Sequence, residues 1–298
     1  MNNMRFTNPA AIILAAGRSS RMGTTKPLML IDGLPMLVHA AEAFRAATID
    51  YIIVVTGFDA ERVQALARES ALHPIYNSNF DKGMFTSVCA GIEALPAEFD
   101  SVFVLPVDIP FVSPQTLKRL QTYANREHGA NAKERGAASA DERGASGTEE
   151  STAAAPVDIN SAGGMPLDIN SAGGTPEAIE KAGALLPSEN GMPAAIEKAG
   201  ALLPGENSLP AAAHSRSVVI PRYKGKAGHP PLIHRSIFGQ LLGWRGPEGL
   251  GGFLKAQSFL VTYLDVEDPF ILRDIDTPHD MQSLISERNL RGPSGFHS

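Results

Sequence analysis

A short basic loop is the first stretch of this sequence whose residue types could do chemistry. LAAGRSSRMGTTKPL, at residues 14–28, directly follows an apolar run and contains Arg18, Arg21 and Lys26. A glycine-containing turn behind a strand aims backbone N–H groups at an anion, and three cations strengthen that attraction. A solvated surface turn would not explain three cations behind a buried strand. The loop therefore predicts an anion-binding site, with phosphate groups as its natural ligand.

The glycines of this loop do not match two well-known phosphate-binding patterns. A Walker P-loop requires GxxxxGK[ST], whereas five residues separate Gly17 from Gly23 here, and Lys26 comes three positions after the second glycine. The dinucleotide-binding pattern GxGxxG is also missing from the loop. We expect Gly17 and Gly23 to supply the positive φ or the close approach that such a loop demands.

Two aspartates are candidates for holding a metal cation beside the anionic ligand of this loop. Asp108 stands in LPVDIP at the end of an apolar run, and Asp276 stands in RDIDTPHD between an expected short strand and a helix start. Ligands bind at the carboxyl ends of strands in open parallel sheets, and Mg²⁺ takes one or two carboxylates together with phosphate oxygens. Taken alone, either aspartate is explained as well by capping. Further acidic candidates in the same region are Asp268, Asp274 and Asp280.

The elements that must position these residues alternate between strand and helix. The strands expected in the first half are residues 11–14, 51–55, 75–76 and 101–105. The expected helices begin at Pro35, after the capping residue Asp59, near Phe85 and after the cap formed by Ser113 and Pro114. In the second half we expect strands at 218–220, 231–233 and 258–264, an extended piece at 271–275, and a helix after Thr277. This alternation predicts an α/β fold of three layers, with a mainly parallel sheet and helices on both faces.

The composition changes abruptly between the two halves. Residues 127–215 are rich in Ala, Gly, Glu, Asn, Ser and Pro, and they contain local duplications such as AIEKAGALLP at 178–187 and again at 195–204. Such a composition cannot bury enough apolar surface to offset the entropy of ordering. We therefore expect one domain, formed by residues 1–126 and 216–298, with a disordered, repeat-containing insertion at 127–215.

The overall composition limits the class of protein. The chain has 298 residues, of which 43% are hydrophobic, and its net charge of −6 argues against a nucleic-acid partner. The single cysteine, Cys89, excludes an internal disulfide and a cysteine-cluster metal site. The apolar runs are too short for a membrane span, and the N-terminus leads into the basic loop rather than into a cleavage site. We expect a cytoplasmic protein without a membrane partner.

Five motifs, in order along the chain, carry a resemblance to a known family. They are the loop at 14–28, NSNFDKGMFTSVCAGI at 77–92, LPVDIP at 105–110, KGKAGHP at 224–230 and DIDTPHD at 274–280. Together they resemble the molybdopterin nucleotidyltransferase-like family over residues 10–125 and 216–288. The resemblance implies a Rossmann-like sheet of the nucleotide-diphospho-sugar-transferase type. The Ala15-Ala16-Gly17 form of the loop is similar to the cytidylyltransferase branch of that family.

The resemblance also implies a reaction, in which CMP is transferred from CTP to the terminal phosphate of molybdopterin and pyrophosphate is released, with Mg²⁺ as cofactor. Its implied partners are CTP, molybdopterin, and a molybdenum hydroxylase or its insertion chaperone. It assigns nucleotide binding to Leu14, Ala15, Ala16, Gly17, Arg18, Lys26, Gly83 and Ser87. It assigns acceptor binding to Gly228, His229 and Pro230. It assigns the metal to Asp108 and Asp276, and catalysis to Lys26, Arg21 and Asp108.

One departure from the family pattern keeps other functions open. The chain has GWRGPEGLGGFL at 243–254, where the family has a GDxGAR-like stretch near the acceptor. A sister enzyme acting on a sugar phosphate or polyol phosphate, and an enzyme using GTP, remain alternatives. A non-catalytic protein that binds nucleotide or molybdenum cofactor as a chaperone is the alternative of another class.

Overall fold

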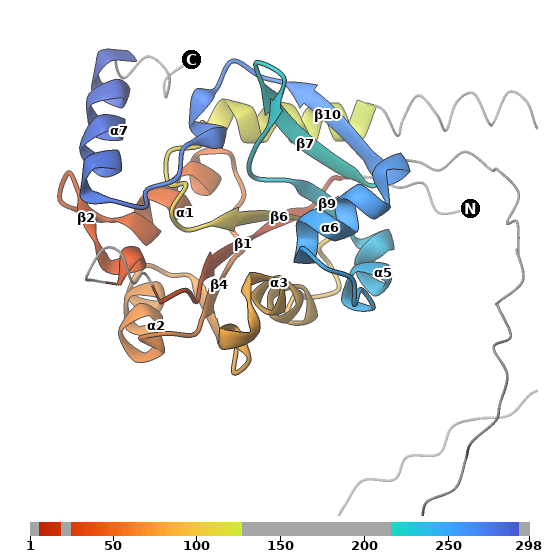
Figure 1. Ribbon diagram of the computed structural model, residues 1–298, viewed down its shortest axis with the longest axis horizontal. Helices are drawn as coiled ribbons and strands as arrows, with labels where there is room; N and C mark the ends of the chain where they lie inside the picture. The colour runs from red at the N-terminus through yellow and green to blue at the C-terminus, as the bar shows by residue number, and fades with distance from the viewer. Residues whose placement is uncertain (1–5, 19–24, 127–215, 292–298) are drawn as a thin grey trace, which may run out of the picture. The chain divides into compact units, whose positions relative to one another are not determined.

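The centre of the fold is a sheet with the strand order β10-β7-β9-β6-β1-β4-β5 (Figure 1). The structure is a computed structural model, and it describes residues 6–18, 25–126 and 216–291, all within one compact unit. The strands are β1 (Pro9–Ala15), β4 (Ile52–Thr56), β5 (His73–Tyr76), β6 (Ser101–Pro106), β7 (Val218–Tyr223), β8 (Lys226–Ala227), β9 (Leu232–His234) and β10 (Val261–Asp265). β8 pairs only with β7.

The sheet is mainly parallel, as the alternation of strands and helices predicts. β6, β1, β4 and β5 run parallel to one another, and Ile12 of β1 lies between Val104 of β6 and Ile53 of β4. β10 is parallel to β7. β9 runs antiparallel to both β6 and β7, so it joins the strands of the first half to those of the second. The two halves of the chain therefore form one continuous sheet.

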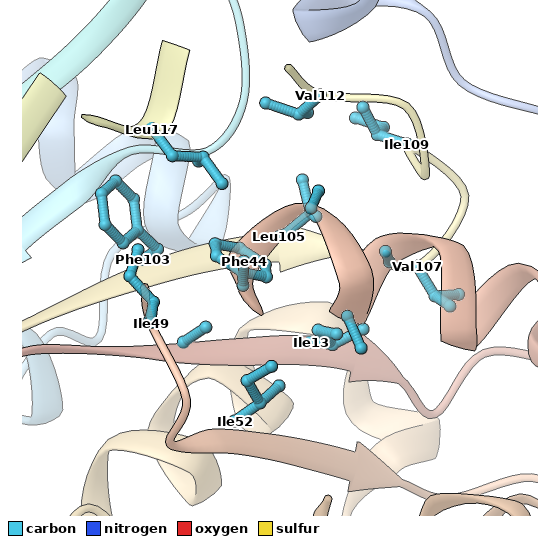
Figure 2. Packing of buried hydrophobic residues seen from close by; sticks show 14 of the residues in the cluster. Ile13, Phe44, Ile49, Ile52, Phe103, Leu105, Val107, Ile109, Val112 and Leu117 are labelled. Atoms are coloured by element: carbon cyan, nitrogen blue, oxygen red, sulfur yellow. The ribbon is translucent and has the colours of Figure 1, made fainter. Parts of the chain in front are cut away.

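Helices cover both faces of this sheet and complete three layers. Alternating residues of β1 point to opposite faces, as the pleat of a strand requires. Ile13 and its neighbours pack under α1, α2, the helix over 114–126 and α7, and Figure 2 shows Phe44 and Phe103 in this core. Ile12 packs on the other side, under α3, α5 and α6. The helices are α1 (Met36–Ala46), α2 (Ala60–Glu69), α3 (Met84–Glu93), α5 (Phe238–Leu242), α6 (Gly249–Ala256) and α7 (Pro278–Arg291).

Short elements lie at the margins of the three layers. β2 (Leu30–Ile31) and β3 (Leu34–Pro35) form a separate antiparallel hairpin. The 3₁₀ helices are η1 (Lys26–Leu28), η2 (Phe80–Lys82), η3 (Arg235–Ile237), η4 (Ser258–Leu260) and η5 (Pro269–Leu272). Among the described residues, no helix is both long and apolar enough to cross a membrane. The expected insertion at 127–215 lies outside the described residues.

Two expected extended segments prove to be partly 3₁₀ helix. Residues 258–260 form η4, and the strand begins only at Val261. Of the extended piece expected at 271–275, residues 271–272 belong instead to η5, which begins at Pro269. The cause in the second case is local, because Pro269 fixes a helical φ at the first position and the Asp268 carboxylate accepts a hydrogen bond from Phe270 N at 3.0 Å. Asp268 is therefore a buried helix cap and not a metal ligand.

The residue predicted to cap α2, Asp59, does not cap the helix with its side chain. Asp59 occupies the N-cap position, but its φ of 53° is left-handed and its side chain makes no capping hydrogen bond. A capping side chain normally requires an extended backbone at that position. The Asp59 carboxylate instead accepts a hydrogen bond from Thr25 Oγ1 at 2.6 Å and pairs with Arg62. It therefore anchors the end of the basic loop against α2.

Candidate active site

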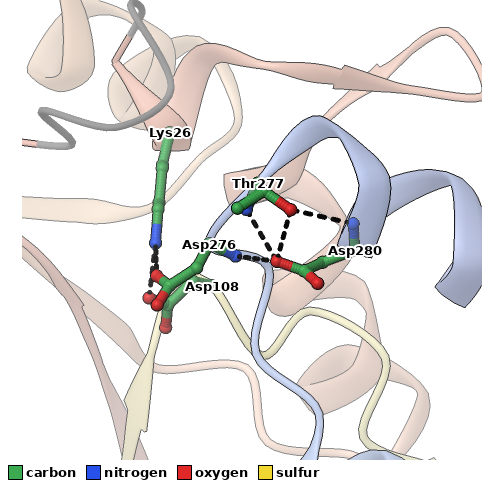
Figure 3. A network of polar contacts seen from close by, with 5 residues as sticks. All are labelled: Lys26, Asp108, Asp276, Thr277 and Asp280. Atoms are coloured by element: carbon green, nitrogen blue, oxygen red, sulfur yellow. Dashed lines mark hydrogen bonds and ion pairs between the residues drawn. The ribbon is translucent and has the colours of Figure 1, made fainter.

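The Lys26 side chain points toward two aspartates that come from distant parts of the chain (Figure 3). Its Nζ is 3.0 Å from Asp108 Oδ2 and 2.6 Å from Asp276 Oδ1. The exposed fraction of the side chain is 11% for Lys26, 25% for Asp108 and 42% for Asp276. The ammonium is thus nearly enclosed, whereas both carboxylates still face solvent. The structure brings together the three residues that the sequence singles out for phosphate and metal binding.

The charge on Lys26 is set by two opposing effects. Burial disfavours the charged form, but the hydrogen bonds to Asp276 and Asp108 outweigh it, so the pKa of Lys26 is raised above its ordinary value of 10.5. Lys26 therefore carries a full positive charge at neutral pH. Its backbone begins η1, where Pro27 follows it directly and restricts the turn.

Asp276 is held in place by the start of α7. Asp280 Oδ2 accepts hydrogen bonds from Thr277 N at 2.7 Å and from Asp276 N at 3.2 Å (Figure 3). In return, Thr277 Oγ1 accepts a hydrogen bond from Asp280 N at 3.2 Å, which is a reciprocal cap. Thr277 is therefore the cap of α7, and the carboxylate of Asp276 contacts Lys26.

A backbone hydrogen bond joins the two aspartate segments. Ile275 N donates to Asp108 O at 2.9 Å, so the residue before Asp276 is tied directly to Asp108. Asp108 follows β6, as predicted. Asp276 does not follow a strand, because residues 273–275, which connect it to the end of η5, belong to no strand. The site is thus built where the end of one central strand meets an irregular segment from the C-terminal part.

A cavity of about 290 Å³ opens beside Lys26 and Asp108. It is lined by Leu14, Ala15, Ala16, Gly17, Lys26, Pro27, Phe80, Met84, Ser87, Pro106, Val107 and Asp108. Gly17 does not have the expected positive φ, and a Cβ built there would meet no atom of the described residues within 4 Å. The space beside Gly17 is therefore open to a ligand, which agrees with the expected close approach rather than with backbone strain.

Ser87 is the residue of this cavity with the best-defined polar role. Its Oγ accepts a hydrogen bond from Asn77 Nδ2 at 3.0 Å, and both side chains are buried. Asn77 Nδ2 also donates to Thr86 Oγ1 at 2.8 Å, while Asn77 Oδ1 accepts from Asn79 N. Because the Asn77 amide donates to Ser87, the Ser87 hydroxyl proton is available to a ligand. Sequence reasoning missed Asn77, although it begins one of the five motifs.

A second cavity, of about 550 Å³, adjoins the first. Leu14, Met84 and Pro106 line both cavities, so they form a shared wall. Gly83, Gly228 and His229 line this second cavity, whereas Pro230 is buried and does not. The remaining lining residues are Lys82, Phe85, Val88, Val104, Ile220, Ala227, Pro231, Glu248, Gly249, Leu250, Gly251 and Leu254. Gly83, which the resemblance assigns to nucleotide binding, thus lines the larger cavity and not the cavity beside Lys26.

The loop that carries His229 is fixed to the C-terminal part of the site. His229 N donates to Ile271 O at 2.9 Å, and a Cβ at Gly228 would lie only 2.5 Å from the same oxygen. Only glycine therefore allows this close approach. Burial lowers the pKa of His229 below its ordinary value of 6.5, although a hydrogen bond at Val104 acts in the opposite direction. The imidazole is accordingly neutral near pH 7.

Of the two arginines in the basic loop, Arg18 is the one that lies among the described residues. The Arg18 guanidinium lies 5.6 Å from the ring centres of both Phe58 and Phe80, which is cation–π distance. It does not line either cavity. Arg21 and Gly23 lie outside the described residues. Phe80, which sequence reasoning missed, links Arg18 to the smaller cavity.

The two carboxylates fit a magnesium ion bound together with phosphate. Asp108 and Asp276 both reach one point, the Lys26 Nζ atom, at hydrogen-bonding distance. Mg²⁺ in phosphate-transfer sites usually takes one or two carboxylates and completes its shell with water and phosphate oxygens. Within the described ranges, no group of three or more His, Cys, Asp or Glu side chains is arranged to hold a metal. The donor set therefore suits a metal that arrives with its substrate.

Solved structures show that the fold recurs in other proteins. The chain is similar to Rv0371c from Mycobacterium tuberculosis, with 18% identity and a TM-score of 0.57, covering 94% of this chain and 99% of that one. It is also similar to a nucleotidyl transferase from Methanothermobacter thermautotroptrophicus, with 15% identity and a TM-score of 0.57, covering 96% and 100%. At these identities the likeness concerns the fold alone.

The first half of the chain is similar in sequence to known proteins and to one described family. The bifunctional protein GlmU of Agrobacterium fabrum is 37% identical over 112 residues, which is 37% of this chain and 25% of that protein. The aligned part thus spans about a quarter of that relative. Residues 11–158 match the family described as the MobA-like NTP transferase domain. Residues 11–158 are therefore similar to the MobA-like NTP transferase domain.

Proposed function

We propose that this protein is a molybdenum cofactor cytidylyltransferase, which transfers CMP from CTP to the terminal phosphate of molybdopterin. An oxygen of that phosphate attacks the α-phosphorus of CTP, the bond from the α-phosphorus to the bridging oxygen breaks, and pyrophosphate leaves. The observation that carries the proposal is the pair of adjoining cavities with Lys26 and Asp108 in the wall of one. Such a pair suits a reaction that joins two substrates.

The smaller cavity is the proposed nucleotide site. Lys26 supports the negative charge that builds up on the phosphates, and the backbone of Ala15 to Gly17 approaches the nucleoside closely because Gly17 has no side chain. The Ser87 hydroxyl donates a hydrogen bond to an acceptor on the base edge, held in that role by Asn77. A phosphate monoester is already anionic at neutral pH, so the reaction needs no strong general base. Catalysis then rests on bringing anions together and stabilising charge.

The metal role is assigned to Asp108 and Asp276. When bound, Mg²⁺ neutralises charge on the phosphate oxygens and so favours departure of pyrophosphate. Asp108 lines the nucleotide cavity and Asp276 does not, but both meet at Lys26. The reciprocal cap at the start of α7 keeps Asp276 from turning away.

The larger cavity is the proposed acceptor site, and its lining favours a flat ring over a sugar. Most of the side chains that line it are apolar, for example Phe85, Leu250 and Leu254, whereas Lys82 and Glu248 are its charged members. A sugar or polyol brings several hydroxyl groups, and each buried hydroxyl without a partner costs stability. A pterin ring has large faces that an apolar wall can cover. The apolar lining supports molybdopterin as the proposed acceptor, and the panel of sugar and polyol phosphates tests the alternative.

A pyrophosphate-release assay tests the proposal. The purified protein is given each of the four ribonucleoside triphosphates with Mg²⁺, with molybdopterin, with a panel of sugar and polyol phosphates, or without acceptor. We expect pyrophosphate only with CTP and molybdopterin together, and an equal amount of CMP-linked product. Turnover with a sugar or polyol phosphate, or with GTP, would replace the substrate assignment. Tight nucleotide binding without any pyrophosphate would favour a cofactor-binding chaperone.

A substitution in α6 separates the acceptor cavity from the nucleotide cavity. Gly251 lines the larger cavity, and a Cβ there would meet nothing within 4 Å, so Gly251→Leu fills space without strain on its neighbours. We expect the KM for the acceptor to rise roughly tenfold or more, with the KM for CTP unchanged. Gly239→Leu is the matched control, since Gly239 is also helical and unobstructed but lines neither cavity. An unchanged acceptor KM in Gly251→Leu would contradict the placement.

A further inference from the structure

Lys26 already neutralises part of the charge on the two carboxylates assigned to the metal. Its Nζ contacts one oxygen of Asp108 and one of Asp276, at 3.0 and 2.6 Å. Two carboxylates carry two negative charges, and the ammonium balances one of them. A divalent ion bound to the same pair would lie a few ångströms from the ammonium, and like charges at that distance repel strongly where water is partly excluded. The lysine and the metal therefore compete for the carboxylates.

The position of Lys26 offers the ammonium a second partner. Lys26 lines the nucleotide cavity together with Asp108. Asp276 instead lines a separate cavity of about 350 Å³, beside Asp274 and His279. The ammonium thus contacts one aspartate that lines the nucleotide cavity, Asp108, and one that lines the other cavity, Asp276. A triphosphate in the nucleotide cavity brings several negative charges, and a lysine side chain can turn toward them because its stem is long and rotatable.

We infer that Lys26 is a built-in counter-ion, which the triphosphate draws away from Asp108 and Asp276 and which thereby opens the carboxylate pair to the divalent metal. This inference rests on the proposed function, since it takes the metal role of the two aspartates from there. It implies an order of binding: the two carboxylates pair with Lys26 until the nucleotide binds, and they bind the metal afterwards. Lys26 therefore serves as a positioning residue for the metal in addition to its contact with the phosphates.

The exchange couples the two ligands thermodynamically. If nucleotide binding removes the ammonium from the carboxylates, then nucleotide tightens metal binding, and metal tightens nucleotide binding by the same factor. Metal alone has to displace Lys26 without help, so its affinity is held low. Removing the charge of Lys26 should therefore improve binding of metal alone, although the same change harms turnover. A lysine that only contacts phosphates would leave the binding of metal alone unchanged.

The test measures binding of Mn²⁺ alone, by electron paramagnetic resonance, to the full-length chain without nucleotide. We expect Lys26→Met to bind Mn²⁺ about tenfold more tightly than the wild type, because the competing charge is gone. Lys26→Arg retains the charge and should bind as the wild type does. Lys82→Met is the matched control, because it removes a lysine charge from the wall of the other cavity. Lys26→Gln replaces Lys26→Met if the latter fails to fold.

The outcomes distinguish this inference from the proposed function. The gain in Lys26→Met should disappear in the double variant Lys26→Met/Asp108→Asn, which places the bound ion at the carboxylate pair. If Asp108→Asn weakens Mn²⁺ binding but Lys26→Met leaves it unchanged, the counter-ion role is wrong and the metal role stands. If Mn²⁺ binding is the same with and without Asp108, the metal assignment fails, and this inference fails with it.

Discussion

Lys26 Nζ lies 2.6 Å from Asp276 Oδ1, although 250 residues separate the two in the sequence. The contact shows that the site is complete only when the C-terminal part of the chain has joined the sheet. β9 makes that connection by pairing with both β6 and β7. Any change that loosens the start of α7 should therefore affect the chemistry as well as the stability of the fold.

The reciprocal cap at the start of α7 gives the first prediction. Thr277→Ala removes the hydroxyl that accepts a hydrogen bond from Asp280 N and donates one to Asp280 Oδ2. Loss of such a cap costs about 1 kcal/mol of unfolding free energy. We also expect kcat to fall, because Asp276 N is held by the same Asp280 carboxylate. Urea unfolding and steady-state kinetics measure the two effects.

Thr277→Ser is the control for this prediction, since serine keeps the hydroxyl and the cap. It should behave as the wild type in both measurements. If Thr277→Ala lost stability but kept its full kcat, the cap would have no part in positioning Asp276.

The contact between α3 and β1 gives the second prediction. A Cβ built on Gly91 of α3 would lie 2.7 Å from Ile12 Cγ2, so the helix approaches the strand too closely for any side chain. Gly91→Ala should therefore lower the unfolding free energy by about 1–3 kcal/mol, as overpacking does in a well-filled core. Gly239→Ala in α5 is the matched control, because its Cβ would meet nothing within 4 Å.

The control should be neutral or slightly stabilising, because alanine favours a helix over glycine. Both variants are compared by chemical denaturation under the same conditions. Equal stability of Gly91→Ala and the wild type would mean that α3 moves away from β1 at little cost.

His229 gives a prediction about pH. Burial lowers its pKa in the folded chain below the ordinary value of 6.5, so the unfolded chain binds the proton more readily. The contribution of His229 to folding is therefore fully present above about pH 6.5, and it is lost as the pH falls toward the lowered pKa. In His229→Gln this part of the acid destabilisation should vanish.

The measurement is the free energy of unfolding from urea titrations between about pH 5 and pH 8, for the wild type and His229→Gln. The difference between the two proteins isolates His229 from the other titrating groups. Two curves that run parallel below pH 6.5 would show that the imidazole titrates alike in the folded and unfolded chain.

The central strands are the part of the fold that the residue pattern predicts best. β4 and β6 are buried at every position, and a strand covered on both faces appears in a sequence as a continuous apolar run. The errors in the expected extended segments fall at residues 258–260 and 271–272, where short apolar runs form 3₁₀ turns. Such runs do not distinguish a strand from a buried turn by periodicity. At 269–272 the proline and the capping aspartate decide the outcome.

The members of the site are more predictable than their arrangement. Lys26 and Asp108 stand out because polar residues follow apolar runs at the ends of two adjacent strands. The approach of Asp276 depends on the path of the whole second half of the chain, which no local spacing reveals. The role of Asn77 is hidden for another reason: its partner Ser87 lies ten residues later, on α3, and only burial shows that the two must satisfy each other.

The account depends most on the claim that Asp108 and Asp276 act together on a metal–triphosphate, and one measurement tests it directly. Pyrophosphate release from CTP with molybdopterin is followed for Asp108→Asn, Asp276→Asn and the control Asp274→Asn, whose exposed side chain lies two residues before Asp276. We expect each of the first two to lower kcat roughly a hundredfold or more, while the control keeps its rate. A near-normal rate in Asp108→Asn or Asp276→Asn, in a protein that folds as the wild type does, would contradict the shared site.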